Sequence, residues 1–332
     1  MEILALDPHH PSAGTWYAAM YAGCAAGRTA PPVIGELSLL TGLRTNSTNP
    51  NSDRRAWGAW EGGRCLGTLL LALSRQDNTH LAGVDVNVPP EHRGRGVGAA
   101  LFERGLAEAR LAGRTVVGNE VNVTGELADS PGGRFALARG FVSQHTEQRL
   151  LLDLPLADAD LAAREREGAE RSAGYRALSW TGVVPAARVD DLVRLHNQMQ
   201  RDVPSGDLDR EPVAYDAERL TAGQTRSLAQ GYGMVTTMVL DPAGAPAAYT
   251  MMYVAADGGS AFQDDTFVLT AHRGHRLGTL AKAANLRLLA EHFPATGYVH
   301  TWTAQVNDAM RSINERFGFR PVETMHAVEL RL

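Results

Sequence analysis

The sequence predicts an α/β fold of the α+β kind, in which two similar domains each contain a mixed, mostly antiparallel sheet flanked by helices. Three observations predict this fold. The chain of 332 residues is long enough for two domains with separate cores. Two glycine-rich turns of nearly the same sequence, "HRGRGVG" at 92–98 and "HRGHRLG" at 272–278, lie far apart in the chain. Strand-like and helix-like segments recur around each turn in the same order.

The composition is typical of a soluble globular protein, with 44% hydrophobic and 21% charged residues. No apolar run approaches the ~20 residues that a membrane span requires. The first residues also lack the pattern of a signal peptide, so the chain is expected to be cytoplasmic. A net charge of −5 disfavours nucleic acid as a partner. The two cysteines, Cys24 and Cys65, lack the spacing of a zinc site, and no metal is expected.

The repeat extends well beyond the two turns. Arg273 follows Arg93 at an interval of 180 residues (273 − 93), and the strand-like run 64–73 lies opposite 244–253 at the same interval. The other matched features are Asp85 with Asp265, Val88 with Val268 and, at an interval of 178 residues (318 − 140), Gly140–Phe141 with Gly318–Phe319. The repeating unit therefore has the size of a domain.

Each half has a helical region, two or three antiparallel strands, the glycine turn, a helix, a strand, a second helix and a late strand. The helix after the first turn is predicted over 97–113, because apolar residues alternate with charges and Gly113 ends it. Its counterpart is predicted over 277–293, closed by Pro294. The following strands are predicted at 114–123 and 297–306.

The predicted domains are an N-terminal domain over 1–155 and a C-terminal domain over 174–332. Residues 156–173 are polar and rich in alanine, and we interpret them as a linker or a short solvated helix.

Each turn has the features of an anion-binding site. A helix that begins shortly after a strand directs its free N–H groups at the strand's end, and glycines let a phosphate approach the backbone. In the first copy Gly94, Gly96 and Gly98 are accompanied by Arg93 and Arg95. The acidic residue of a dinucleotide-binding turn and the Lys-Ser/Thr of a P-loop are both missing.

Arg93, Gly96 and Gly98 complete the pattern Arg-x-x-Gly-x-Gly after an antiparallel sheet. This pattern resembles the GCN5-related N-acetyltransferase (GNAT) superfamily, and the likeness covers nearly the whole chain as two copies. The resemblance implies that acetyl-CoA binds with its pyrophosphate in the turn and its pantetheine along the preceding strand. The implied binding residues are Val88, Arg93, Gly94, Arg95, Gly96, Val97 and Gly98 in the first copy, and Val268, Arg273, Gly274, His275, Arg276, Leu277, Gly278, Thr279 and Asn307 in the second.

The second copy has Arg276 in place of the middle glycine. Its guanidinium could meet a phosphate, or it could be a solvated side chain in a copy that has lost ligand binding. The family often has an asparagine after the next strand, which Asn307 matches. It also often has a tyrosine that protonates the thiolate, but the matching residues are Asn314 and Ala136, so the general acid is unassigned.

The resemblance favours the C-terminal copy as the catalytic one, since the tandem arrangement is similar to that of mycothiol synthase and related actinobacterial acetyltransferases. Asp265 is the candidate catalytic base, with Gln263 expected on the same face and Asp264 on the other. A structural ion pair explains Asp265 equally well. His196 and His300 are expected to serve helix and strand packing.

The expected function is direct transfer of an acetyl group to a primary amine of an aminosugar, antibiotic, polyamine or peptide. The acidic loop 201–216 suggests a cationic acceptor. Two alternatives remain open: catalysis in the N-terminal copy with Asp85, or a non-catalytic acyl-CoA-binding protein. The sequence does not indicate an oligomeric state.

Overall fold

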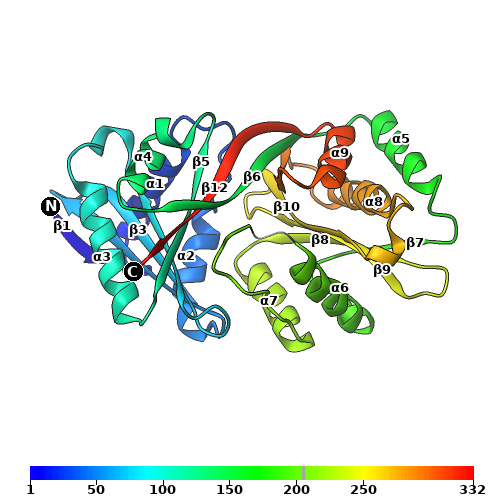
Figure 1. Cartoon of the computed structure of the whole chain (residues 1–332), viewed down its shortest axis with the longest axis horizontal. Coiled ribbons are helices and arrows are strands. Elements are labelled where there is room, and N and C mark those ends of the chain that lie inside the picture. Colours follow the sequence, from blue (N-terminus) through cyan, green and yellow to red (C-terminus); the bar gives the residue numbers. More distant parts are fainter. Residues whose placement is uncertain (204–205) are drawn as a thin grey trace. The chain divides into compact units, whose positions relative to one another are not determined.

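The computed structural model describes residues 1–203 and 206–332, and these form two compact units (Figure 1). Unit 1 contains the described residues of 1–146, 206–211 and 323–332, and unit 2 contains those of 147–203 and 212–322. Each unit has its own mixed sheet flanked by helices, which confirms the predicted fold class.

Unit 1 contains a six-stranded sheet in the order β1-β2-β3-β4-β5-β12. Neighbouring strands are antiparallel except for β4 and β5, which are parallel. The strands are β1 (Glu2–Ala5), β2 (Ser52–Glu61), β3 (Arg64–Ser74), β4 (Leu81–Asn87), β5 (Val116–Val123) and β12 (Arg320–Arg331). The helices are α1 (Ser12–Ala25), α2 (Glu36–Arg44), α3 (Val97–Leu111) and α4 (Pro131–Leu137).

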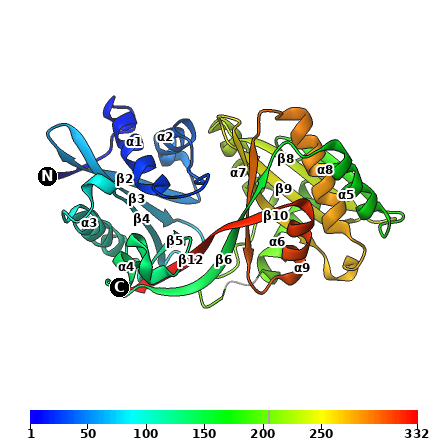
Figure 2. The same ribbon diagram turned by 90° about the horizontal axis from the view of Figure 1, so that it is seen from above.

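The helices of unit 1 cover both faces of its sheet, with α1 and α2 on one face and α3 and α4 on the other (Figure 2). The core beneath α3 contains Leu69, Leu101 and Val117, each almost fully buried. The core beneath α1 and α2 is built around Trp16, whose indole N–H donates to the Trp57 carbonyl at 2.8 Å. Burial of these apolar side chains is the main term that holds the layers together.

Unit 2 has the corresponding sheet in the order β6-β11-β10-β9-β8-β7. The parallel pair is now β10 and β11. The strands are β6 (Val142–Asp153), β7 (Arg176–Thr181), β8 (Gly233–Leu240), β9 (Pro246–Val254), β10 (Ser260–Val268) and β11 (Tyr298–Ala304). The helices are α5 (Asp158–Ala169), α6 (Val189–Asp202), α7 (Ala217–Ala229), α8 (Leu277–His292) and α9 (Asp308–Phe317).

In unit 2 the helix α8 lies on one face of the sheet, and α6 and α7 lie on the other (Figure 1). Leu286, Val299 and Ala261 form part of the core beneath α8. Leu195 and Phe267 form part of the core beneath α6 and α7. These two faces carry different polar groups, which is what gives unit 2 its candidate site.

The segment expected to be a linker contains α5, and this helix packs on α8. Leu161 belongs to the core of unit 2 and is almost fully buried. Gly168 lies so close to α8 that an added Cβ would come within 2.9 Å of the Leu280 backbone. The segment is therefore an integral part of unit 2.

The last strand of each sequence copy is β6 or β12, and the repeat alone does not predict which sheet each of these strands joins. Residues 147–153 of β6 pair with β11 in unit 2, and residues 324–331 of β12 pair with β5 in unit 1. Arg28, just beyond the end of α1, forms an ion pair with the buried Glu323 of β12 at an N–O distance of 2.7 Å. Local sequence defines a strand but not the sheet edge that it joins. The boundaries at 155 and 174 remain a prediction of where each copy begins and ends in the sequence.

Candidate active site

The two glycine turns have the same backbone conformation. In unit 1, Gly94 and Gly96 lie in the left-handed region with φ of 74° and 80°. In unit 2, Gly274 has φ of 86° and Arg276, directly before α8, has φ of 55°. A side chain in this region costs about 1 kcal/mol or more. Arg276 therefore adopts, with strain, the conformation that glycine adopts freely.

The side chain of Arg276 binds α5. Its Nη1 lies 2.8 Å from Glu170 Oε2 and donates to the Glu167 carbonyl at 3.2 Å. The Arg276 guanidinium thus attaches the turn to α5, a contact that a glycine at this position would not make. The group therefore has protein partners, and a contact between Arg276 and a phosphate stays a prediction.

The other arginines of the turns also have protein partners. The Nε of Arg93 donates to the Val88 carbonyl at 3.0 Å, and the Nε of Arg273 donates to the Val268 carbonyl at 3.3 Å. Arg95 forms an ion pair with Glu61 at 3.0 Å. The bonds of Arg93 and Arg273 attach each turn to the end of the strand before it, so these two arginines stabilise the conformation of the turn.

Open space lies next to the backbone of both turns. A Cβ added to Gly94, Gly96 or Gly274 would meet no atom within 4 Å. Nearby residues anchor the two helices: Val97, Leu277 and Thr279 are buried, Gly98 packs on Phe135, Gly278 packs on Ile313, and His275 lies against Tyr175. The free N–H groups at each helix start can therefore be approached by a phosphate.

The parallel strands of each unit diverge just before the turn. In unit 2, β10 and β11 pair at three positions, the last between Phe262 and His300. Beyond it, β10 continues along β9 and β11 continues along β6. Within the described residues, the facing edges of 263–268 and 301–304 have no strand partner, and we call this opening the β10–β11 gap. Such edges can pair with the amides of an extended ligand.

A β-bulge in β10 marks the start of the gap. The register with β9 shifts between Gln263 and Asp265, so Asp264 is an extra residue. Ala261 lies in the core beneath α8 and Phe267 in the core beneath α6, although strict alternation would place both on one face. Gln263 and Asp265 therefore lie on opposite faces, and the expectation of a shared face was wrong. The Gln263 amide donates to the carbonyls of Met251 and Asp265, at 2.7 and 2.8 Å.

The bulge brings Asp265 against His196 and Tyr249. The Tyr249 hydroxyl donates to Asp265 Oδ2 at 2.6 Å, and His196 Nδ1 lies 3.2 Å from the same oxygen. All three side chains are buried. Burial and the Asp265 carboxylate raise the pKa of Tyr249 well above its usual value, so the phenol remains a donor. The carboxylate favours the His196 tautomer with the proton on Nδ1.

The second ring nitrogen of His196 has a buried lone pair. Its Nε2 has no hydrogen-bond partner within the described residues. The Tyr215 ring packs edge-on against the imidazole with a centroid separation of 4.6 Å. A carboxylate on Nδ1 with a free Nε2 is the arrangement of a general base. Besides the helix packing that the sequence suggested, His196 therefore contacts Asp265 and Tyr249.

Asp264, the bulged residue, is exposed and lies beside Asp265. Crowding by surrounding protein atoms and repulsion from the Asp265 carboxylate raise the pKa of Asp264 well above its usual range.

Unit 1 lacks this arrangement. Asp85 accepts a hydrogen bond from the Asn87 amide at 3.0 Å, and burial raises its pKa. By strand register Thr68 takes the place of Tyr249, and α1 contains no histidine. The β4–β5 pairing also ends after three positions, but β4 has no bulge against β3. The two copies share the turn and the gap and differ in the groups around them.

Asn307 follows a short turn after β11 and caps α9. Its side-chain oxygen accepts a hydrogen bond from the Met310 N–H at 3.1 Å. Capping accounts for this oxygen locally. The position at the end of β11 remains the one predicted for a ligand contact.

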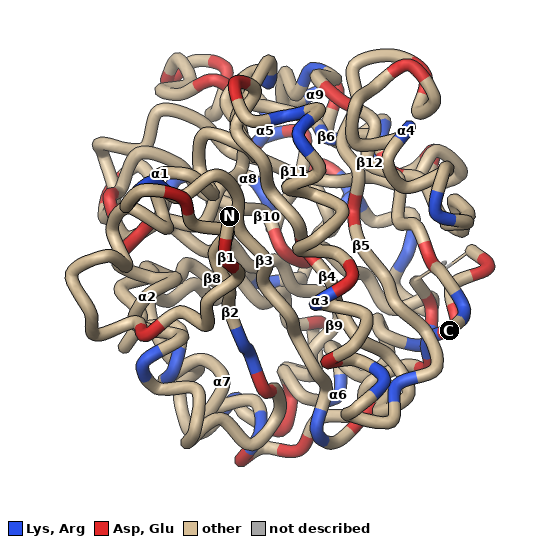
Figure 3. The backbone as a smooth tube through the Cα atoms, turned by 90° about the vertical axis from the view of Figure 1, so that its left-hand side faces the viewer, with Lys and Arg blue, Asp and Glu red and all other residues tan. Residues whose placement is uncertain are grey.

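Charges are interspersed along the chain (Figure 3). Residues 204 and 205 of the acidic loop lie outside the described residues. Three acids of the loop have partners: Asp202 pairs with Arg273, Asp209 pairs with Arg331, and Asp216 caps α7. The loop therefore carries less free negative charge than its sequence suggests.

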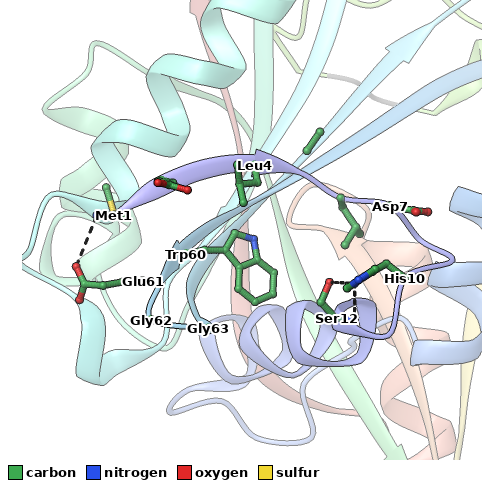
Figure 4. Close-up of a pocket in the computed structure, with 12 residues that line it drawn as sticks. Met1, Leu4, Asp7, His10, Ser12, Trp60, Glu61, Gly62 and Gly63 are labelled. Atoms are coloured by element: carbon green, nitrogen blue, oxygen red, sulfur yellow. Dashed lines mark hydrogen bonds and ion pairs between the residues drawn. The ribbon is translucent and has the colours of Figure 1, made fainter.

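A surface pocket of about 660 Å³ lies in unit 1 between β1, the β2–β3 turn and the start of α1 (Figure 4). Met1, Leu4, His10, Trp60 and Glu61 are among its lining residues. No residue of the glycine turn lines it, although Glu61 is the partner of Arg95. The pocket is therefore separate from the candidate active site.

Within the described residues, no helix is long and apolar enough to cross a membrane. In both copies a glycine turn lies between a sheet with diverging parallel strands and a helix. Residues 35–126 match the family model described as "Acetyltransferase (GNAT) family". This match lies within unit 1, and a solved tandem GNAT structure extends the similarity to both copies.

Solved structures show the tandem arrangement over the full chain. A tandem GNAT protein from the clavulanic acid biosynthesis pathway is 26% identical, with a TM-score of 0.79 and coverage of 99% of this chain and 98% of that one. A GCN5-related N-acetyltransferase from Sphaerobacter thermophilus has the same fold, at 14% identity, a TM-score of 0.68 and coverage of 99% and 95%. A search of curated protein sequences finds no match.

Proposed function

We propose that this chain is an acetyl-CoA-dependent N-acetyltransferase in which unit 2 transfers the acetyl group directly to a primary amine. The observation that carries the proposal is the contact between His196 and Asp265 beside the β10–β11 gap, with Nε2 of His196 free. The corresponding part of unit 1 has Asp85 without a histidine. The two units therefore differ in the histidine that would take a proton from an amine acceptor.

The donor is expected to bind across the turn and the gap of unit 2. Backbone N–H groups at the start of α8 receive the pyrophosphate, supported by the open space beside Gly274. The unpaired edge of β10 up to Val268 pairs with the amides of the pantetheine arm. This places the thioester at the gap, between the two faces of the sheet.

The chemistry then needs one base and one leaving-group site. His196 takes a proton from the ammonium form of the acceptor, directly or through one water, because only the neutral amine has a lone pair for attack. The new C–N bond forms as the thioester C–S bond breaks, and the electron pair of that bond remains on sulfur. Asp265 keeps the imidazole oriented and stabilises the imidazolium.

The acceptor is proposed at the level of a small primary amine, such as an aminosugar, an antibiotic, a polyamine or a peptide. The acidic loop was the reason to expect a cationic acceptor, and its pairing to Arg273 and Arg331 reduces that support. The acceptor must enter from the α6 face, where His196 lies, since α8 covers the other face.

Thiol release from acetyl-CoA across a panel of primary amines tests the proposal, with His196→Gln and Asp85→Asn as a matched pair. His196→Gln is expected to lower kcat by about 10²-fold or more with little change in the KM for acetyl-CoA. Asp85→Asn is expected to retain activity. Loss of activity in Asp85→Asn alone would place catalysis in unit 1. CoA binding without turnover for any amine would favour a binding protein.

A further inference from the structure

A buried lysine on α8 begins a chain of three polar side chains in unit 2. The Nζ of Lys282 donates to Asn314 Oδ1 at 2.7 Å, and the Nδ2 of Asn314 donates to Thr303 Oγ1 at 3.0 Å. Lys282 is 1% exposed and Asn314 is fully buried. The three residues come from α8, α9 and β11, which are separate elements of unit 2.

The surroundings of Lys282 are neutral. Its Nζ lies 5.2 Å from the centre of the Phe319 ring, and its hydrogen-bond partner is the uncharged Asn314 amide. No acid contributes to its electrostatics within the described residues, and burial alone lowers the pKa of Lys282 to about 7. An ammonium in such a place lacks a counter-ion, and it would gain one from an anion that binds nearby.

The other copy shows that the fold does not need this chain. Lys282 corresponds to Phe102, and Asn314 corresponds to Ala136, by the intervals of the repeat. Thr303 is three residues beyond the last β10–β11 pair, as Val121 is beyond the last β4–β5 pair. Phe102, Ala136 and Val121 all pack into one apolar core. Three apolar contacts in unit 1 are therefore replaced together by a connected polar chain in unit 2.

The donors of the chain are all directed towards Thr303. Because Asn314 donates to the Thr303 oxygen, the hydroxyl proton of Thr303 is available for another acceptor. Thr303 lies in the part of β11 that diverges from β10. Side chains alternate along a strand, so Thr303 shares a face with Val299, which belongs to the core beneath α8. His196 belongs to the opposite, α6 face. The β10–β11 gap separates the His196 side chain on one face from the chain of polar donors on the other.

We propose that Lys282, Asn314 and Thr303 form the leaving-group site of unit 2, in which the Thr303 hydroxyl donates a hydrogen bond to the departing thiolate of CoA. The proposal rests on the proposed function, because it assumes that the thioester lies in the gap. Thr303 contacts the sulfur, while Asn314 and Lys282 are positioning residues that orient and polarise that hydroxyl.

The step balances without an additional reactant. The sulfur leaves with the electron pair of the broken C–S bond, and the Lys282 ammonium offsets its negative charge through the chain. Two protons leave the nitrogen as the ammonium becomes the amide: His196 passes the first to solvent before the attack, and the second, released after the C–N bond forms, converts the thiolate to the thiol. Acetyl-CoA and the amine thus yield the amide and CoA, and the enzyme recovers its starting protonation state.

The direct test is the thiol pKa of CoA bound to the full chain, measured by the ultraviolet absorbance of the thiolate during a pH titration. We expect the pKa of bound thiol to lie about one unit or more below that of free CoA. Lys282→Met should abolish the part of this shift that arises in unit 2. The matched variant Phe102→Met, at the corresponding position of unit 1, should leave the shift unchanged.

A second pair of variants separates the hydroxyl from the fold. Thr303→Val removes the hydroxyl and keeps the shape, and it should lower kcat and raise the bound-thiol pKa. Thr303→Ser restores a hydroxyl and should recover both readouts. Equal thiol pKa values in wild type, Lys282→Met and Thr303→Val would overturn the leaving-group site alone. Failure of the wild type to bind CoA would instead overturn the proposed function.

Discussion

The Nδ1 of His196 on α6 and the Oδ2 of Asp265 on β10 lie 3.2 Å apart, although the residues are 69 positions apart in the sequence. Their contact depends on the bulge at Asp264, which turns Asp265 towards α6. Together with Tyr249 they form a buried cluster that has a free nitrogen lone pair at Nε2. This cluster is one of the features that distinguish unit 2 from unit 1.

If Asp265 acts through His196, the two residues should behave as one unit in kinetics. Asp265→Asn is expected to lower kcat by about 10²-fold, because the amide no longer favours a proton on Nδ1. The double variant His196→Gln/Asp265→Asn should be little slower than His196→Gln. The measurement is kcat from thiol release with one active amine. Strictly additive losses would show that the two residues act independently.

The two glycine turns can be compared with a matched pair of substitutions at the first turn of each helix. Gly278→Glu places a carboxylate where a phosphate is expected and crowds Ile313, while Gly98→Glu does the same beside Phe135. We expect Gly278→Glu to abolish turnover and Gly98→Glu to remove CoA binding in unit 1 only. Calorimetric stoichiometry of CoA binding and turnover are the readouts. Loss of turnover in Gly98→Glu alone would contradict the assignment to unit 2.

Arg276 offers a test of what the altered turn does. Arg276→Gly removes the strain of a side chain on a left-handed backbone, which is about 1 kcal/mol. The substitution also removes the contacts with Glu167 and Glu170. We expect the free energy of unfolding to change by less than about 1 kcal/mol, since the two effects oppose. The Kd for CoA should change less than about threefold. A tenfold weaker Kd would show that the guanidinium contacts a phosphate after all.

Lys282 should give a measurable pH dependence of stability. The pKa of Lys282 in the folded protein, about 7, is below its ordinary value of 10.5, so between these pH values the unfolded chain binds the extra proton. Stability then rises with pH in this window, by at most about 1.4 kcal/mol per unit, and the gain is lost as pH falls towards 7. Urea unfolding of wild type and Lys282→Met at several pH values from 7 to 9 measures it. Parallel curves for the two proteins would contradict the shift.

The ion pair between Arg28 and Glu323 is expected to hold β12 in the sheet of unit 1. Arg28→Met leaves the buried Glu323 carboxylate without the guanidinium and should cost about 3–5 kcal/mol of unfolding free energy. Changing both residues, as Arg28→Met/Glu323→Leu, should recover much of that loss. Chemical denaturation of the single and double variants measures the coupling. An undiminished loss in the double variant would indicate that the cost lies in packing.

Much of the architecture was predictable because it depends on local patterns. The repeat located the strands β3 and β9, the helices α3 and α8, and both turns, since glycine spacing and apolar periodicity are local properties of the chain. The same patterns did not show α5 packing on α8. Its core contacts at Leu161 and Gly168 depend on a partner helix more than 100 residues away.

The candidate site was predictable only in part. The turns and Asp265 could be chosen because a motif and a strand position suggest them, whereas His196 carried no signal in the sequence. The bulge also escaped prediction, because whether one residue is extra in β10 depends on its pairing with β9. Lys282, Asn314 and Thr303 could have been found by comparing the two copies, which have apolar residues at the same places.

The sequence by itself determined that this protein contains two copies of one fold, each with a glycine turn before a helix, because local periodicity and glycine spacing encode those parts. The tertiary structure alone decided which polar groups meet around the gap of unit 2. His196 meets Asp265, and Lys282 meets Asn314, only after separate elements pack and exclude water from these contacts. Burial strengthens the electrostatic interactions between such side chains, so their properties depend on partners from other segments and cannot be predicted from any single segment.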